Sequence, residues 1–454
     1  MDTAPPNATP SLTDGSLLRA LHRLAAPMLV GAVLSNLQSV INLFWVGRLG
    51  PQAVAAVAVG GTILMLLFPA LMGLSTGTVA LVARAIGAGR RDEAAAAAGQ
   101  SLSLAVALGL LSGLLGWRLS DDLFRLLGAA PDIVADGEAY LRINLLGSFS
   151  LFLFIIASAA LQGAGDARTP MWLGLGANGL NIALDPLLIY GWGPVPALGV
   201  RGAALASVIA ETLAAIVAAG VLLGGRAALH IGWSQCRPRL ALAWRILRIG
   251  IPGSGQMLAR SLMGAVLMRI VAGCGTAAVA AYGTGLRFHM LILMPAFALG
   301  GAAATLVGQN LGAGKPGRAR QAAWLATGLD LLIMLVVIVL LAGFAPALIR
   351  AFNRDPDVVR IGASYLRIVS PFYFFAAFGV IIGRALNGAG DSLAPMIITT
   401  LSLWGLQVPL ALWLVRWWQP ATAGIWWAIG LASAVNGLLM VLWFETGRWQ
   451  HRQV

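Results

Sequence analysis

The chain has 454 residues, and 59% of them are hydrophobic while only 10% are charged. A soluble domain has about a quarter of its residues charged, so this composition excludes a soluble globular protein as well as a disordered or fibrous one. The net charge is +13, but the basic residues lie in short loops between apolar runs, which indicates contact with anionic lipid head groups rather than nucleic acid. Cys236 and Cys274 form no CxxC pair, so neither a disulfide framework nor a metal centre is expected.

Twelve continuous apolar runs follow one another along the chain. Each is close to the length of about 20 residues that a helix needs to cross a bilayer. The strands of an outer-membrane barrel would instead give short alternating segments, so an all-α integral membrane protein is predicted. The expected spans are 24–46, 53–74, 95–117, 136–160, 170–190, 201–223, 246–271, 277–300, 321–343, 361–385, 394–416 and 422–444.

Lys and Arg residues are unevenly distributed between the loops on the two sides of the membrane. With the N-terminus inside, the inner loops and tails carry 16 of them and the outer loops carry 8. This bias predicts a multi-pass protein of the bacterial inner membrane with both termini in the cytoplasm. The expected segments are a cytoplasmic N-terminal segment (1–23), an N-lobe (24–223), a cytoplasmic linker (224–245), a C-lobe (246–444) and a cytoplasmic tail (445–454).

The sequence repeats itself with an offset of 225 residues. The stretch YLRI at 140–143 recurs at 365–368, GAGD at 163–166 recurs at 388–391, and Pro27 matches Pro252. Low complexity does not align such motifs without a gap, so the repeat indicates a duplication. Each unit holds six spans, an even number, which predicts two pseudo-symmetric six-helix bundles in a parallel repeat. Such a design supports alternating access in a secondary transporter, and the sequence carries no ATP-binding P-loop motif.

Polar side chains inside the spans are few, and in a bilayer they are candidates for function. Asn178, Asn181 and Asp185 lie at i, i+3 and i+7 and therefore share one helix face. The first span adds Asn36, Gln38 and Asn42. An oxygen-rich site of this kind could hold a proton on Asp185, or Na⁺ on Asp185 and Asn181, or only join helices by hydrogen bonds. The predicted cation-coupling residues are Asp185, Asn181, Asn178, Asn42, Ser207 and Glu211.

Other intramembrane residues suggest a substrate cavity and a bending point. Pro27 is either a hinge or a static kink in the first span. Asp330 is expected to pair with an arginine, and His289 to be a hydrogen-bonded structural residue. Methionines adapt to varied apolar ligands, although single ones also simply pack. The residues predicted to line the cavity are Gln38, Met65, Met257, Arg260, Arg287 and Met290.

Several motifs in order resemble the multidrug and toxic compound extrusion (MATE) family. They are VGRLG at 46–50, AVAA at 53–56, RAIGAG at 84–89, GAGD at 163–166 and VGQNLGAG at 307–314. The resemblance implies twelve helices in two lobes and the export of organic, often cationic and lipophilic drugs or toxic compounds. It implies H⁺ or Na⁺ as the exchanged ion and no other cofactor. It also implies a transporter rather than an enzyme, in agreement with four scattered histidines that form no catalytic cluster.

Within that family the chain is most similar to the DNA-damage-inducible bacterial branch. This likeness implies that Asn181 and Asp185 form part of the N-lobe cation site, with Ser207 in place of a threonine and Pro27 as the proline proposed to bend. Asn42 stands where that branch has an aspartate, and Arg260 stands where another branch has a glutamate. The lost acids favour H⁺ over Na⁺. A flippase of a lipid-linked precursor remains the alternative, because the C-lobe spans carry several arginines. The protein is expected to be a monomer surrounded by membrane lipids.

Overall fold

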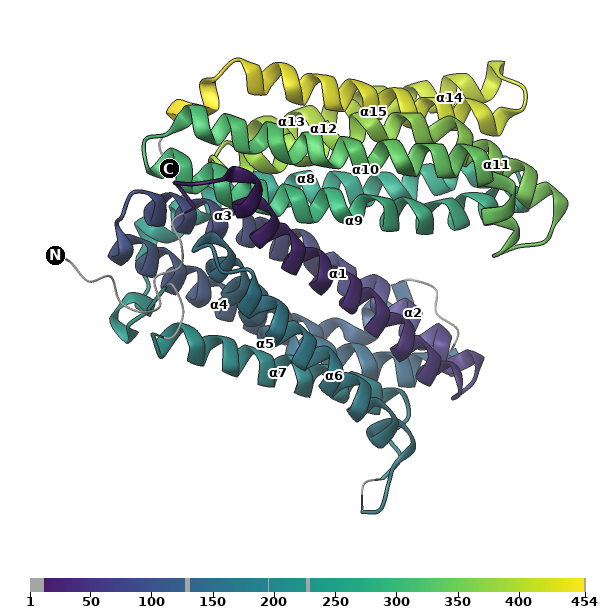
Figure 1. Ribbon diagram of the computed structural model, residues 1–454. Helices are drawn as coiled ribbons and strands as arrows, with labels where there is room; N and C mark the ends of the chain where they lie inside the picture. Colours follow the sequence, from purple (N-terminus) through teal and green to yellow (C-terminus); the bar gives the residue numbers. More distant parts are fainter. Residues whose placement is uncertain (1–11, 127–130, 195, 226–228, 453–454) are drawn as a thin grey trace. The chain divides into compact units, whose positions relative to one another are not determined.

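The computed structural model describes residues 12–126, 131–194, 196–225 and 229–452 (Figure 1). Helices account for the regular structure in these ranges, which contain no strand element. The first half contains α1 (Leu17–Gly47), α2 (Pro51–Leu64), η1 (Met65–Leu67), α3 (Phe68–Gly87), α4 (Arg91–Leu126), α5 (Pro131–Gly163), α6 (Arg168–Tyr190) and α7 (Val200–Leu223). The second half contains η2 (Trp233–Cys236), α8 (Leu240–Ala272), α9 (Thr276–Gly312), α10 (Pro316–Arg350), α11 (Pro356–Val369), η3 (Ser370–Phe372), α12 (Tyr373–Gly388), α13 (Leu393–Thr400), η4 (Leu401–Gln407), α14 (Val408–Trp417), α15 (Ala421–Glu445) and η5 (Arg448–His451).

The predicted spans agree with these helices. Ten helical segments in the described ranges are long and apolar enough to cross a membrane, and three of the ten join consecutive elements, such as α2 to α3 over Pro51–Gly87. The other two long helices, α6 and α8, carry the intramembrane asparagine, aspartate and arginine side chains described below. All twelve predicted spans therefore lie in helices, and the prediction of an all-α membrane protein is confirmed.

The breaks between helices repeat in geometry as well as in sequence. Gly89 and Gly314 have φ of 73° and 70°, and Gly165 and Gly390 have φ of 92° and 88°. Each pair is separated by 225 positions, and each glycine follows the end of a long helix. Glycine adopts this left-handed conformation without strain, which ends a helix and lets the chain reverse.

The chain folds into two compact units whose boundaries fall inside two helices. One unit contains Ala26–Gly250, and the other contains Leu12–Ala25 together with Ile251–Val454. The first turns of α1 thus belong to the C-terminal unit, while the first turns of α8 belong to the N-terminal unit. Both boundaries occur at the same position of the repeat, one residue before Pro27 in the first half and one residue before Pro252 in the second.

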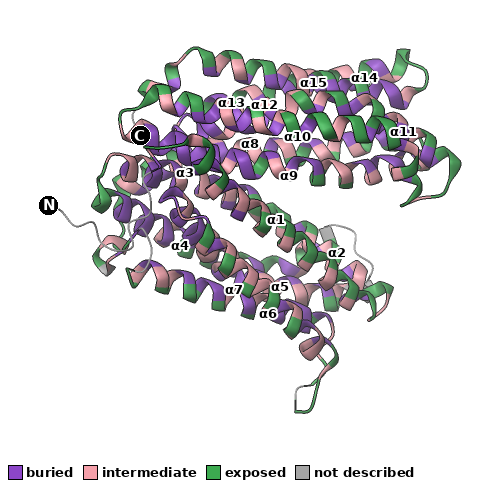
Figure 2. Ribbon diagram, in the orientation of Figure 1, coloured by how far each residue is buried: buried purple, intermediate pink, exposed green. Residues whose placement is uncertain are grey.

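In the N-terminal unit, α5 packs against α2, α3, α4 and α7. Small residues allow these close contacts: a Cβ on Gly202 would lie 2.2 Å from the carbonyl oxygen of Leu188. The segment between the halves is tied to α4, since the Ser103 hydroxyl donates to the Cys236 carbonyl at 2.7 Å. Figure 2 shows buried residues (purple) inside the helical bundle and exposed residues (green) along its outer faces.

In the C-terminal unit, α9 packs against α10, α11 and α12, and α12 packs against α15. The outer face of α10 exposes large apolar side chains such as Leu335, Val336 and Val339, as expected for a helix facing lipid. At one end of this unit Lys315 pairs with Asp14 at 2.7 Å, and Arg452 pairs with Asp391 at 3.2 Å.

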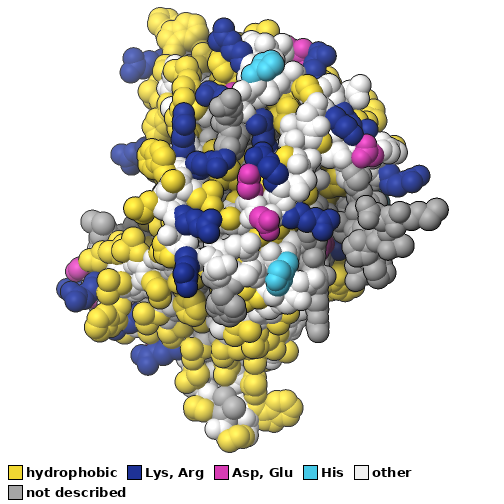
Figure 3. All heavy atoms as spheres, turned by 90° about the vertical axis from the view of Figure 1, so that its left-hand side faces the viewer, with side chains coloured by type: hydrophobic (Ala, Val, Ile, Leu, Met, Phe, Trp, Pro, Cys, Tyr) yellow, Lys and Arg dark blue, Asp and Glu magenta, His cyan; other side chains and the backbone are white. Residues whose placement is uncertain are grey.

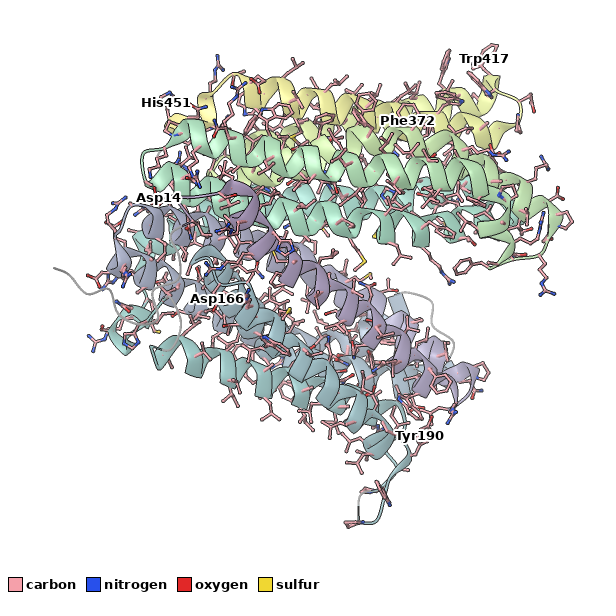
Figure 4. The ribbon with its side chains drawn as sticks, viewed as in Figure 1. Asp14, Asp166, Tyr190, Phe372, Trp417 and His451 are labelled. Carbon is pink, nitrogen blue, oxygen red and sulfur yellow. The ribbon has the colours of Figure 1, made fainter. Side chains whose placement is uncertain are left out.

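Both ends of the described chain lie at this end of the C-terminal unit. Figure 4 shows Asp14 and His451 there, with Trp417 at the opposite end. Figure 3 shows Lys and Arg side chains gathered on the face that carries them.

Candidate functional site

A ladder of hydrogen bonds joins α1 to α6 in the N-terminal unit. Asn178 donates to the Ser35 hydroxyl at 3.5 Å, Gln38 donates to the Asn181 side-chain oxygen, and Asn42 donates to Asp185 Oδ2 at 3.3 Å. The partners in every rung are 143 residues apart, so the i, i+3, i+7 faces of the two helices meet in register. The sequence placed three of these residues on one face of α6, and the structure brings that face against α1.

Burial increases along the ladder. Ser35 is exposed, Asn181 retains 3% of its accessible surface, and Asp185 retains none. Asp185 Oδ1 has no hydrogen-bond partner among the described residues. No ion pair of the described ranges includes this carboxylate. A buried carboxylate in this state is stabilised by binding a proton or a metal cation.

Two further helices complete the surroundings of Asp185. On α7, the Ser207 hydroxyl accepts from Asn181 at 3.2 Å and donates to the backbone carbonyl of Ala203 at 3.2 Å. On α5, Tyr140 lies close enough to both Asp185 and Glu211 for their charges to interact with its hydroxyl. The predicted residue Ser207 therefore belongs to the ladder by a hydrogen bond, whereas Glu211 is related to it only through the influence of its charge on Tyr140.

Sequence reasoning missed Ser35 and Tyr140. Ser35 was detectable, because it precedes Gln38 and Asn42 at the same i, i+3, i+7 spacing that singled out the α6 residues. Asn36, which the sequence also assigns to the site, donates its amide N–H to the Ala32 carbonyl of its own helix at 3.0 Å. Nothing in the local sequence distinguishes Tyr140, whose role depends on the packing of α5.

The ladder is absent from the corresponding helix of the second half. Ser35, Gln38 and Asn42 correspond at the 225 offset to Arg260, Met263 and Leu267 on α8. Met263 and Leu267 lie in the apolar core of the C-terminal unit. The two halves therefore share the helical framework, while the polar ladder occurs only on the first-half helix of this pair.

Comparison with known proteins agrees with this architecture. The family model described as MatE matches residues 27–187 and 252–413, one match in each half of the repeat. The chain belongs to the MatE family. The predicted resemblance is thereby confirmed, and the protein is a membrane transporter rather than an enzyme; no comparison tests the branch within the family.

Relatives of this MatE protein span nearly its whole length. "Probable multidrug resistance protein NorM" of Thermotoga maritima is 31% identical over 458 aligned positions, covering 99% of this chain and 96% of the relative. "FAD transporter" of Shewanella oneidensis is 30% identical and covers 88% of each chain. A solved MOP superfamily transporter from Pyrococcus furiosus, described as having reverse polarity of its binding pocket, has a TM-score of 0.89 at 27% identity over 97% of this chain and 98% of its own.

The residues predicted to line a substrate cavity divide between the two units of the MatE protein. Gln38 is a rung of the ladder, whereas Met65 in η1 is 70% exposed. In the C-terminal unit, Met257 and Arg260 on α8 are half-buried, and Arg287 and Met290 on α9 are exposed. The structure thus leaves their assignment to a cavity as a prediction. Pro27 lies inside α1, which continues through it to Gly47.

One interpretation of the C-terminal unit was wrong. Asp330 on α10 was expected to pair with an arginine, but it is fully buried and neither of its carboxylate oxygens has a partner among the described residues. Sequence alone gives no distance between helices, so a nearby arginine could not be ruled out. His289 is hydrogen-bonded as expected, with Nδ1 3.0 Å from the Tyr373 hydroxyl. No group of three or more potential metal ligands occurs within the described ranges.

Proposed function

We propose that this MatE protein is a secondary active multidrug efflux antiporter of the bacterial cytoplasmic membrane, which exports organic lipophilic compounds, often cationic, in exchange for H⁺. The observation that carries the proposal is the buried carboxylate of Asp185, which has one unpartnered oxygen within a polar ladder. The relatives named as multidrug resistance proteins support drugs or toxic organic compounds as the substrates. Cytoplasmic termini and a monomer surrounded by lipid complete the proposal.

The donor set of the ladder favours H⁺ over Na⁺. A sodium ion needs several oxygen ligands, preferably including negative charge. The Asn181 oxygen already accepts from Gln38, the Ser207 oxygen accepts from Asn181, and Asn42 presents an N–H to Asp185. One carboxylate oxygen remains, which is sufficient for a proton. Asn42 also contributes no charge at a position where an aspartate would have added a second carboxylate.

Protonation supplies the difference between the two transport states. With the site open to the outside, a proton neutralises Asp185 and weakens its charge-assisted hydrogen bond from Asn42, which loosens α1 from α6. The helix then bends near Pro27, where proline leaves a backbone carbonyl without its N–H partner. Release of the drug follows because the protonated state binds it less tightly than the charged state does.

A flippase of a lipid-linked precursor is less well supported. It would share a two-lobe helical design, and its expected feature is a strongly cationic cavity. The relatives are named as multidrug resistance proteins or, in one case, as an FAD transporter, and none of these names describes a lipid-linked precursor.

Dye efflux from everted vesicles, with H⁺ and Na⁺ gradients imposed separately, tests the proposal. An antiporter coupled to H⁺ moves ethidium against its concentration gradient when the pH gradient is imposed and stops when that gradient is collapsed. Movement driven by the Na⁺ gradient alone would overturn the choice of ion. Failure of both gradients to drive uphill movement would overturn antiport itself.

A further inference from the structure

The C-terminal unit contains a group of cationic side chains at membrane depth that the proposed coupling mechanism does not use. Arg260 lies on α8, His289 on α9 and Arg384 on α12. Arg260 is close enough to both of the others for their charges to interact. These three residues are called the arginine cluster below.

Packing between α8 and α12 explains why the two arginines approach each other. Asn387 on α12 donates to Gln256 on α8 at 3.5 Å, and Gln256 donates in turn to the Thr399 hydroxyl at 3.1 Å. Arg260 lies four residues after Gln256, and Arg384 lies three residues before Asn387. The two helices contain the seventh and the tenth predicted spans, so they run in opposite directions. Arg260 and Arg384 therefore both lie about one helical turn from the Gln256–Asn387 hydrogen bond, on the same side of it.

The guanidinium of Arg384 packs against an aromatic ring of a neighbouring helix. Its Cζ lies 5.0 Å from the centre of the Phe297 ring on α9. Gly300, one turn further along α9, makes room for the side chain, because a Cβ there would lie 2.9 Å from Arg384 Cδ. The imidazole of His289 is positioned by its 3.0 Å hydrogen bond with Tyr373.

No acidic side chain of the described residues forms an ion pair with the two arginines of the cluster. None of the ion pairs found in the described ranges includes Arg260 or Arg384. Two guanidinium groups close together in a bilayer are costly unless an anion compensates them. The corresponding positions of the first half are occupied by Ser35 and Ala159, so the helical framework does not require arginine there.

We propose that the arginine cluster binds the anionic group, a carboxylate, sulfonate or phosphate, of an amphipathic organic molecule. Arginine suits this role because its planar donors pair with such groups in a bidentate manner and it stays charged in an apolar environment. The inference deepens the proposed transport function, on which it rests, since it adds anionic and zwitterionic compounds to the substrates. The anionic group can come from a transported compound or from a lipid head group.

Binding and transport measured on the purified full-length protein test the cluster. The probes are anilinonaphthalene sulfonate, an amphipathic fluorescent anion, and ethidium, a cation. Each substitution, Arg260→Gln and Arg384→Gln, should weaken saturable anion binding by about tenfold or more, the usual effect of losing a hydrogen bond to a charged group. Arg269→Gln is the matched control, because Arg269 lies on the same helix but is exposed, and it should leave the dissociation constant within about twofold.

Two further measurements distinguish a lipid head group from a free organic anion as the ligand, and a lost binding site from a variant that does not fold. Proteoliposomes of phosphatidylcholine with added phosphatidylglycerol should show tenfold weaker dye binding if lipid head groups occupy the cluster, and unchanged binding if free organic anions do. Arg384→Lys keeps the charge but not the planar donors and should give intermediate binding, a measurement that stands if a glutamine variant does not fold. The inference is wrong if wild-type protein shows no saturable dye binding or if all cluster variants bind like wild type. Loss of proton-driven ethidium efflux from wild-type protein would instead count against the proposed function.

Discussion

Replacement of Asp185 by asparagine should uncouple the transporter without unfolding it. The side chains are nearly equal in size, and the site is fully buried, so packing is preserved. The one hydrogen bond that the carboxylate accepts, from Asn42 at 3.3 Å, can also be accepted by the new amide oxygen. Only the ability to carry a charge in one state and none in the other is lost, and the variant should resemble the protonated form permanently.

The magnitude follows from the single proton that Asp185 can exchange. A tenfold proton gradient is worth about 1.4 kcal/mol per proton, so at one H⁺ per substrate it supports accumulation of a neutral compound of up to about tenfold. In proteoliposomes with a pH difference of about one unit, wild-type protein should approach this ratio, whereas Asp185→Asn should equilibrate substrate to a ratio of about one. The membrane potential is clamped at zero with valinomycin and equal K⁺ on both sides, because exchange of one H⁺ for a neutral dye moves one net charge.

The matched control is Asp330→Asn, which also removes a fully buried aspartate but lies outside the ladder. It should retain accumulation driven by the pH gradient. If Asp185→Asn accumulates the dye as well as wild-type protein does, the carboxylate is not the coupling group and the reasoning from its burial fails.

Three other substitutions give separate outcomes. Asn42→Asp places a second carboxylate beside the first, so efflux should become stimulated by Na⁺, which parallel Na⁺ and K⁺ vesicle assays would detect. Pro27→Ala restores a helical hydrogen bond to α1 and should raise the melting temperature while slowing efflux by about tenfold; unchanged efflux would show that the proline is a static kink. Gly202→Ala forces a Cβ against a backbone oxygen at 2.2 Å and should destabilise the protein by about 1–3 kcal/mol, whereas Gly179→Ala, with open space around it, should not; equal melting curves for the two would contradict the packing argument.

The sequence was sufficient for the helices because apolar length and glycine breaks determine where a chain can cross a bilayer. The predicted spans are shorter than the helices: the span expected at 53–74 ends well before the helical segment does, at Gly87. Helices extend beyond the apolar stretch into the interfacial and loop regions, where hydropathy no longer reports them. The α6 face of the site was predictable for a similar reason, since the spacing of Asn178, Asn181 and Asp185 lies within a single helix.

Contacts between helices could not be derived in the same way. The register that joins Ser35 to Asn178, the approach of Tyr140 to Asp185 and the absence of a partner for Asp330 all depend on how separate helices pack. Periodicity identifies a face but not the residue opposite it. The two unit boundaries were likewise invisible, because a helix that passes from one unit to another has no break in its sequence pattern.

The reciprocal placement of the opening turns of α1 and α8 has a consequence for dissection of the protein. A chain cut within 224–245 would give two fragments. The first would carry the opening turns of α1, which belong to the C-terminal unit, and the second would carry the opening turns of α8, which belong to the N-terminal unit. Each fragment made alone would lack the opening turns of one helix in its own unit, so transport activity should require both fragments in the same membrane. The repeat thus includes the boundary as well as the helices, since the two crossing points lie 225 residues apart.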